Sequence, residues 1–253
     1  MNQITLNSPP GYGTLVPLDR HRHGGLGLRP DRSLAWCAGL NSVFLSAVEL
    51  AKAALDYPIA FVRDERSGEY QPVAVLGLRA RENLFVGADG QWRPHAYIPA
   101  YVRRYPFCIA EIPAAQGSEA QRLICVQEDQ LVPSASPLFD SAGEPTPGWA
   151  PVLQLIEAVE GARQQTRSFA KRVEAFGLFT PFEALAVPQG GQQLRLQGLF
   201  RVDEQKLDAL GSKETKLLAR KGELRAIYAH LLSLENFAKL LDMTAHGRRN
   251  QAD

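Results

Sequence analysis

The chain has 253 residues, of which 45% are hydrophobic and 22% are charged. These proportions are typical of globular domains that fold by burying apolar surface, and they exclude disordered and fibrous proteins. The 28 Lys and Arg residues nearly balance the 27 Asp and Glu residues, which leaves a formal net charge of +1. Because no excess of positive charge attracts a phosphate backbone, nucleic acid is not an expected partner.

The cysteines and the apolar segments indicate the compartment. Cys37, Cys108 and Cys125 are an odd number and include no CxxC pair, so the sequence predicts reduced, unliganded thiols in a reducing environment. The N-terminal residues show no apolar segment after a basic one, and no stretch approaches the roughly 18 consecutive apolar residues of a membrane span. We therefore expect a cytoplasmic protein without a membrane span.

The first 145 residues have the pattern of short strands and turns. β-branched and aromatic runs alternate there with clusters of Gly, Pro and Asp, which predicts an irregular, mainly antiparallel sheet. The runs at 59–63 and 70–76 flank a segment of turn-forming residues, as a hairpin requires. The segment 41–55 has dense apolar positions without a clear stripe, and it predicts a short buried helix.

The pattern changes near residue 145 from alternation to helical spacing. Thr146 and Pro147 predict the start of a long helix, and Gly177 predicts its end. A Pro-Gln-Gly-Gly turn then predicts a β-hairpin at 184–202, which either packs on the helices or joins the first sheet.

The remaining residues predict more helix. Ser212 is a candidate cap of a short helix, and apolar residues at 224–241 mark one face of a long terminal helix. The predicted fold class is therefore α+β, with a mainly β part at 1–145 packed with a mainly helical part at 146–253 that carries one hairpin. We expect the two parts to form one compact unit.

Motifs that name an enzyme are missing from the sequence. It contains no GxGxxG, GxxxxGK[ST], GxSxG or HExxH. His21 and His23 have a spacing compatible with metal ligation near Asp19, but the flanking arginines and glycines favour a solvated loop. His230, beside an apolar stripe, is typical of a hydrogen-bonded packing residue. No catalytic residue, cofactor or metal site is predicted.

The densest group of polar and aromatic residues is the segment Tyr97–Phe107, YIPAYVRRYPF. An arginine beside a tyrosine suits a carboxylate or phosphate, because guanidinium binds planar anions bidentately and the phenol adds a donor and a stacking face. The alternative is that the tyrosines fill the core and the arginines pair with nearby carboxylates. The candidate ligand- or partner-binding residues of this segment are Tyr97, Tyr101, Arg103, Arg104 and Tyr105.

Two further candidates lie in the turn of the first predicted hairpin. Arg63 and Asp64 belong to an alternating charged run that either faces the Tyr97–Phe107 segment or forms a solvated surface. Within the segment itself, Arg103 and Arg104 are adjacent and must point in different directions. We predict that Arg104 is the one that faces inward.

Several stretches in chain order between residues 14 and 241 carry a resemblance: VPLDRHRH, NSVFLSAVEL, YPIAFVRD, YIPAYVRRYPF, FRVDEQKL and IYAHLLSLENF. Together they resemble the SapC family, bacterial proteins often labelled as S-layer-related or as peptide-transport permeases. The resemblance implies halogenase-like proteins or outer-membrane receptor systems as partners, and it brings no catalytic residues. The permease label conflicts with the lack of an apolar stretch long enough to span a membrane.

Three functions remain open on the sequence. The favoured one is a non-catalytic binding or accessory protein that recognises a peptide, an acidic small molecule or a protein partner. The second is an enzyme of unrecognised type acting on an anionic or peptide substrate, with Tyr101, Arg103 and Arg104 positioning it. Asp64 or Glu65 would be its base. The third is a surface-layer structural protein.

Overall fold

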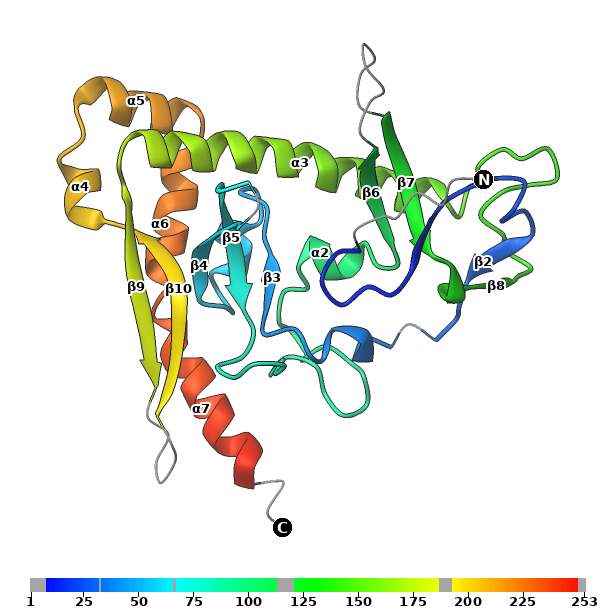
Figure 1. Cartoon of the computed structure of the whole chain (residues 1–253), viewed down its shortest axis with the longest axis horizontal. Helices are drawn as coiled ribbons and strands as arrows, with labels where there is room; N and C mark the ends of the chain where they lie inside the picture. The colour runs from blue at the N-terminus through cyan, green and yellow to red at the C-terminus, as the bar shows by residue number, and fades with distance from the viewer. Residues whose placement is uncertain (1–7, 32, 66, 113–120, 187–192, 250–253) are drawn as a thin grey trace.

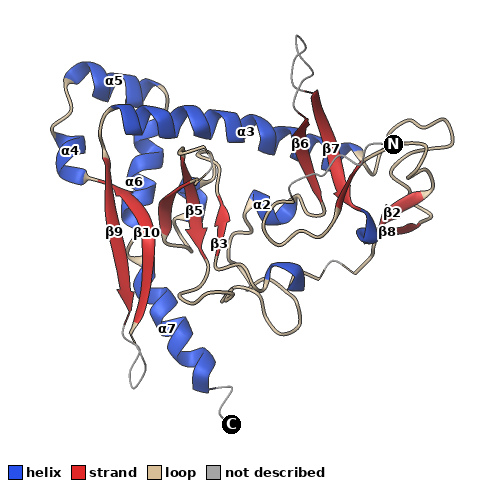
Figure 2. Cartoon of the chain, viewed as in Figure 1, coloured by secondary structure: helices blue, strands red, loops and turns tan. Residues whose placement is uncertain are grey.

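The computed structural model describes residues 8–31, 33–65, 67–112, 121–186 and 193–249 (Figure 1). The strands in these ranges pair antiparallel, and the helices α3 to α7 all follow residue 145 (Figure 2). The predicted α+β class is therefore confirmed. None of the helices in the described ranges combines the length and the apolar character that a membrane crossing needs.

The largest sheet has five strands. In spatial order they are β3 (Ser42–Phe44), β5 (Tyr70–Val75), β4 (Ile59–Arg63), β10 (Leu194–Val202) and β9 (Phe179–Ala186). The hairpin of β9 and β10 thus joins the sheet of the first part, with Leu199 opposite Val62. The predicted turn of this hairpin lies outside the described residues, and the division of the chain near residue 145 stays a prediction.

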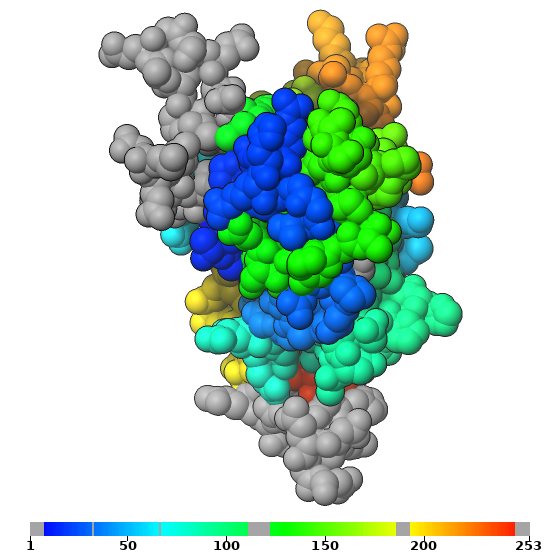
Figure 3. Space-filling model, turned by 90° about the vertical axis from the view of Figure 1, so that its right-hand side faces the viewer, coloured from blue at the N-terminus to red at the C-terminus, as the bar shows by residue number. Residues whose placement is uncertain are grey.

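Two smaller sheets lie at the other end of the molecule (Figure 1). One is formed by β1 (Leu15–Pro17), β7 (Gln121–Gln127) and β6 (Phe107–Ile112), and the other by β2 (Leu26–Leu28) and β8 (Leu131–Pro133). Figure 3 shows blue N-terminal segments against green segments from the middle of the chain on this face. The short 3-10 helices η1 (Ala35–Cys37) and η2 (Glu128–Gln130) belong to the connections here.

The helix α3 (Ala150–Ala175) connects the two ends and contacts both β5 and β6. It begins three residues after the predicted start, because residues 147–149 form a turn before it. It ends as predicted, since Gly177 has a φ of +67°, a left-handed conformation that a side chain disfavours. Its buried face carries Ile156 and Phe169.

The four C-terminal helices are α4 (Glu204–Asp208), α5 (Ser212–Arg220), α6 (Glu223–Ser233) and α7 (Asn236–Arg249). The prediction of one long helix over 224–241 was wrong, because the chain breaks between α6 and α7. At the break, Asn236 Nδ2 donates to the distant Ala54 carbonyl at 2.7 Å, and Ser233 Oγ donates to the carbonyl of His230 in its own helix at 2.6 Å. Such bonds compete with the helical ladder.

The prediction of one buried helix over 41–55 was also only half right. The segment forms β3, then a turn, and only then the four-residue helix α1 (Leu50–Ala53). Val43 of β3 and Leu50 and Ala53 of α1 are buried, because β3 pairs with β5 and α1 contacts α6. The local pattern had no means of separating these cases.

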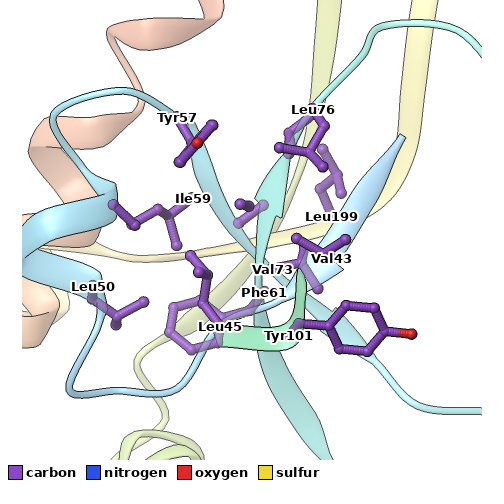
Figure 4. Close-up of a cluster of buried hydrophobic side chains, with 14 of the residues drawn as sticks. Val43, Leu45, Leu50, Tyr57, Ile59, Phe61, Val73, Leu76, Tyr101 and Leu199 are labelled. Atoms are coloured by element: carbon purple, nitrogen blue, oxygen red, sulfur yellow. The ribbon is translucent and has the colours of Figure 1, made fainter. Parts of the chain in front are cut away.

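Two apolar clusters form the core. The larger one joins both halves of the sequence, for example Phe61 of β4 with Phe169 of α3 at a ring separation of 6.2 Å. Figure 4 shows its centre, where Leu45 and Phe61 lie side by side, with Tyr101 at the edge and its ring pointing away from them. The smaller cluster surrounds Phe107 and Trp149. The segment Tyr97–Phe107 therefore runs from one cluster to the other.

Candidate functional site

The segment Tyr97–Phe107 folds around the one-turn helix α2 (Ala100–Arg103). Pro99 precedes the helix with an extended ψ of 145°, and the peptide bond between Tyr105 and Pro106 is cis. After it, Phe107 starts β6. Pro99 and Pro106 thus flank one turn of helix. Side chains of successive residues in this turn point in different directions.

A cavity of about 360 Å³ opens beside this segment, in the range of small-molecule sites. It is walled by three stretches: the residues after β2, the segment itself, and the end of η2. The lining residues are Leu28, Arg29, Asp31, Ser33, Leu34, Ile98, Val102, Arg103, Tyr105, Pro106 and Gln130. Many of these residues are apolar, and two of them are arginines, Arg29 and Arg103.

Arg103 and Arg29 are the cations of the cavity. Arg103 Nε donates to the Ile98 carbonyl at 3.0 Å and Nη2 donates to the Tyr97 hydroxyl at 3.2 Å. Neither arginine forms an ion pair with a carboxylate in the described part of the chain. Asp31 lines the same cavity, and its Oδ1 accepts from the backbone N–H of Ser33 at 3.1 Å.

Arg104 is not among the residues that line this cavity. Its guanidinium lies 5.0 Å from the ring of Tyr101, and its Nε is buried with no acceptor among the described residues. We predicted that Arg104 is the inward-facing arginine. Arg104 is indeed the more buried of the two, but Arg103 is the one that lines the cavity.

Arg104 borders a cluster of four aromatic side chains. Trp36 stacks on Tyr105 with ring centroids 4.2 Å apart, and Tyr12 meets both rings edge-on at 5.3 and 5.1 Å. Tyr101 completes the group, 6.0 Å from Tyr12. Trp36 Nε1, like Arg104 Nε, is buried without an acceptor in the described chain. Tyr105 belongs both to this cluster and to the lining of the cavity, so the cluster lies next to the cavity.

The tyrosines of the segment remain neutral phenols at physiological pH. Burial raises the pKa of Tyr97 to about 12, and the Glu49 carboxylate beside it adds to the shift. Burial likewise raises the pKa of Tyr105 to about 12 and that of Tyr101 above its ordinary range. Their hydroxyls act as hydrogen-bond donors, as Tyr101 does to the Pro10 carbonyl at 2.6 Å.

The structure does not bring Arg63 and Asp64 to the cavity. Arg63 Nε donates to the Gly68 carbonyl at 2.8 Å, and its guanidinium lies over the ring of Tyr70. Asp64 Oδ1 accepts from Ser67 N–H and Oγ within the same turn. These two candidates organise the β4–β5 turn, next to α3, and are not lining residues of the cavity.

The histidines take structural positions. His23 is fully buried, with Nδ1 3.0 Å from the Asp19 backbone and Nε2 3.5 Å from Glu128. His21 is exposed. Within the described ranges, no group of three or more His, Cys, Asp and Glu side chains is placed to hold a metal ion.

The three cysteines are free thiols and all are buried. Cys108 of β6 faces Cys125 of β7 across the strand pair. Burial raises the pKa of Cys37 to about 12 and that of Cys108 to about 11. Thiols held in their protonated form are poor nucleophiles and poor metal ligands.

Several residues of the site escaped the sequence prediction. Arg29, Ser33 and Gln130 reach the cavity from distant segments, and no local pattern distinguishes them. Glu49 is different, because the spacing of Ser46 and Glu49 matches the Ser-x-x-Glu capping pattern and was available in the sequence. Glu49 accepts hydrogen bonds from Tyr97 Oη at 2.9 Å and from the Ala100 N–H at 2.7 Å.

The fold and the cavity together define an α+β protein with an open, partly cationic pocket beside a one-turn helix. The family model described as SapC matches residues 18–240, so the chain belongs to the SapC family. No curated protein and no solved structure shows a significant match to the chain.

Proposed function

We propose that this chain is a non-catalytic binding protein that captures the carboxylate of a peptide or small acidic ligand in the cavity beside α2. The observation that carries the proposal is a pair of arginines, Arg29 and Arg103, that line one cavity and form no ion pair with a carboxylate in the described chain. Guanidinium presents parallel N–H donors that fit a carboxylate, and such charge-assisted bonds are stronger than neutral ones.

The apolar wall supports a ligand with an aliphatic part. Leu34, Ile98 and Val102 line the cavity together with Pro106, and Tyr105 adds an aromatic surface. Specific sites commonly combine such apolar walls with a few polar groups that fix orientation. A peptide ending in an aliphatic residue has both features, since its terminal carboxylate and side chain lie close together.

We also propose that the ligand can be part of a protein partner and that the chain works in the cytoplasm. The family resemblance adds halogenase-like proteins and outer-membrane receptor systems as candidate partners. A peptide terminus belongs to a protein or to a short peptide, and both offer the same carboxylate to the cavity. The matched probe is therefore a single residue that mimics this end of a chain.

The test is a titration with N-acetyl-leucine, which carries the carboxylate, against N-acetyl-leucinamide, which lacks it. We expect the acid to bind and to shift the backbone amide signals of Ser33 and Gln130 in NMR spectra, while the amide binds at least tenfold more weakly. Arg103→Gln should weaken binding of the acid by about tenfold to a hundredfold, the effect of losing charge-assisted hydrogen bonds.

Arg63→Gln is the matched control, because it removes an exposed arginine that does not line the cavity. It should leave the affinity for N-acetyl-leucine unchanged. Equal binding of the acid and the amide, or no signal shifts at the cavity up to millimolar acid, contradicts the proposal.

A further inference from the structure

The buried carboxylate of Glu49 lies close to the segment that contributes Arg103 to the cavity. Glu49 is only 6% exposed, and four donors converge on it. Oε1 accepts from Tyr97 Oη at 2.9 Å and from the Ala100 N–H at 2.7 Å. Oε2 accepts from the backbone N–H of Ser46 at 2.9 Å and from its Oγ at 2.6 Å. All four donors are neutral groups, so the charge of Glu49 is balanced by hydrogen bonds and not by a direct ion pair.

Tyr97 connects this carboxylate to the cavity arginine. Its hydroxyl donates to Glu49 and accepts from Arg103 Nη2 at 3.2 Å. Hydrogen bonds in a chain polarise one another, so a phenol that donates to a carboxylate is a better acceptor for the guanidinium. The position of Tyr97 is fixed further by its backbone, since its N–H donates to Asp56 Oδ2 at 2.8 Å and its carbonyl accepts from the Tyr57 hydroxyl.

Arg103 is consequently held at two points although its side chain is exposed. Nε is anchored to the Ile98 carbonyl and Nη2 to Tyr97, which occupies two of the five N–H groups of a guanidinium. An exposed arginine without such anchors samples many rotamers and loses that entropy on binding. Two anchors restrict the rotamers of Arg103 at the cavity that this residue lines and leave its remaining N–H donors unused by these bonds.

We infer that Glu49 is a positioning residue of the binding site, which holds the Arg103 guanidinium in place through the Tyr97 hydroxyl. Glu49 touches no ligand itself, because it does not line the cavity. The effect on ligand affinity rests on the proposed function, whereas the effect on the mobility of Arg103 does not.

The first measurement needs no ligand. NMR signals of the Arg103 guanidinium report its hydrogen bonding and its exchange with water. We expect Glu49→Gln and Tyr97→Phe each to shift the Arg103 Nη signals and to speed their exchange, because Glu49→Gln removes the charge that strengthens the chain of hydrogen bonds and Tyr97→Phe removes its middle link. Tyr97→Phe keeps the ring and leaves the Ser46 and Ala100 bonds to Glu49 intact, so it tests the inference even if Glu49→Gln fails to fold.

Lys52→Gln is the matched control. Lys52 is exposed and its Nζ lies 5.9 Å from the Tyr97 ring centroid, yet it forms no hydrogen bond to the Tyr97 hydroxyl. This variant removes a charge next to the same tyrosine and should leave the Arg103 signals unchanged. Unchanged Arg103 signals and exchange rates in Tyr97→Phe overturn the inference.

The second measurement is a double-mutant cycle with N-acetyl-leucine as the probe. Tyr97→Phe should weaken binding by about threefold to tenfold, the size of one hydrogen bond. In an Arg103→Gln background the same change should have an effect below about twofold, because the residue it positions is gone. In an Arg29→Gln background it should keep its full effect.

These outcomes separate the two hypotheses. If the wild-type protein binds no N-acetyl-leucine, the proposed function fails, and the NMR measurement still decides whether Glu49 positions Arg103. If the probe binds but Tyr97→Phe costs the same affinity with and without Arg103, the tyrosine acts by another route and the inference is wrong.

Discussion

Two regions of the molecule differ in how their polar groups are paired. One is the contact of α6 with the five-stranded sheet, and the other is the cavity beside α2. At the first, Val202 N–H donates to His230 Nε2 at 3.0 Å and His230 Nδ1 donates to the Ile59 carbonyl at 2.9 Å. Ser233 Oγ accepts from the Ile59 N–H at 2.9 Å. At the cavity, Arg29 forms no ion pair in the described chain and Arg103 uses only part of its donors.

The difference separates structural polar groups from available ones. A buried polar side chain with all its partners inside the protein has no capacity left for a ligand, and its removal costs stability. A half-satisfied guanidinium at a cavity costs the fold little and keeps its donors for an anion. The predictions below test whether this separation holds, from the largest expected effect to the smallest.

The largest effect is expected for His230→Ala. The change removes two hydrogen bonds that join α6 to β4 and β10, and it leaves a buried Ile59 carbonyl and Val202 N–H without partners. Together with the cavity left by the ring, this should lower the free energy of unfolding by about 3–5 kcal/mol, measured by urea denaturation. His21→Ala, at an exposed histidine, is the control and should change it by less than about 0.5 kcal/mol. If His230→Ala lowers the free energy of unfolding by less than about 1 kcal/mol, the distinction between structural and available polar groups does not hold.

The second effect is a pH dependence from the same residue. Burial lowers the pKa of His230 from 6.5 to about 4. The unfolded chain therefore binds a proton between these values while the folded chain does not, so stability is full above pH 6.5 and falls as the pH drops toward 4. The loss should total about 3 kcal/mol.

The measurement compares the unfolding free energy of the wild type with that of His230→Gln at several pH values. Glutamine cannot titrate, so the difference between the two proteins should shrink as the pH falls from 6.5 to 4. Carboxylates such as Glu69, whose pKa is lowered by its hydrogen bond to Arg167, titrate equally in both proteins and cancel. A constant difference over this range shows that His230 does not titrate as expected.

The fold was predictable where the pattern is local. The hairpin of β4 and β5 and the end of α3 at Gly177 follow from turn chemistry and periodicity. The break between α6 and α7 was not, because it depends on Asn236 reaching the Ala54 carbonyl, a contact between distant segments. The same applies to β3, whose strand conformation is set by its pairing with β5.

The site shows the same limit. The composition of Tyr97–Phe107 drew attention to Arg103 and Tyr105, and the structure places both among the residues that line the cavity. Which of two adjacent arginines faces it depends on the one-turn helix α2, and Arg29 reaches it only through the tertiary arrangement. The other two walls of the cavity come from segments that carry no local signal in the sequence.

The smallest effect on the free energy of unfolding is expected for Arg104→Met. This variant allows an unpaired arginine to be compared with a paired one. Had Arg104 been paired with a buried carboxylate, its loss would leave that carboxylate uncompensated and cost several kcal/mol. It has no such partner among the described residues, and its Nε is buried without an acceptor. Methionine keeps the apolar stem against Tyr101 and removes the unsatisfied donor. The free energy of unfolding should therefore change by less than about 1 kcal/mol in thermal or urea denaturation.

Arg172→Met is the matched control for this last prediction, because it makes the same replacement at a paired arginine. Arg172 Nη2 and Nε donate to the Glu223 carboxylate at 2.7 and 2.8 Å, and Glu223 is largely buried. Its loss should cost about 1–3 kcal/mol, since the carboxylate then stays partly desolvated without its cation. If Arg104→Met destabilises the protein as much as Arg172→Met, the contacts of Arg104 with Tyr12 and Tyr101 stabilise the fold as much as a paired carboxylate does, and Arg104 belongs with His230. If only Arg172→Met destabilises the protein, an arginine stabilises this fold only where it is paired with a carboxylate.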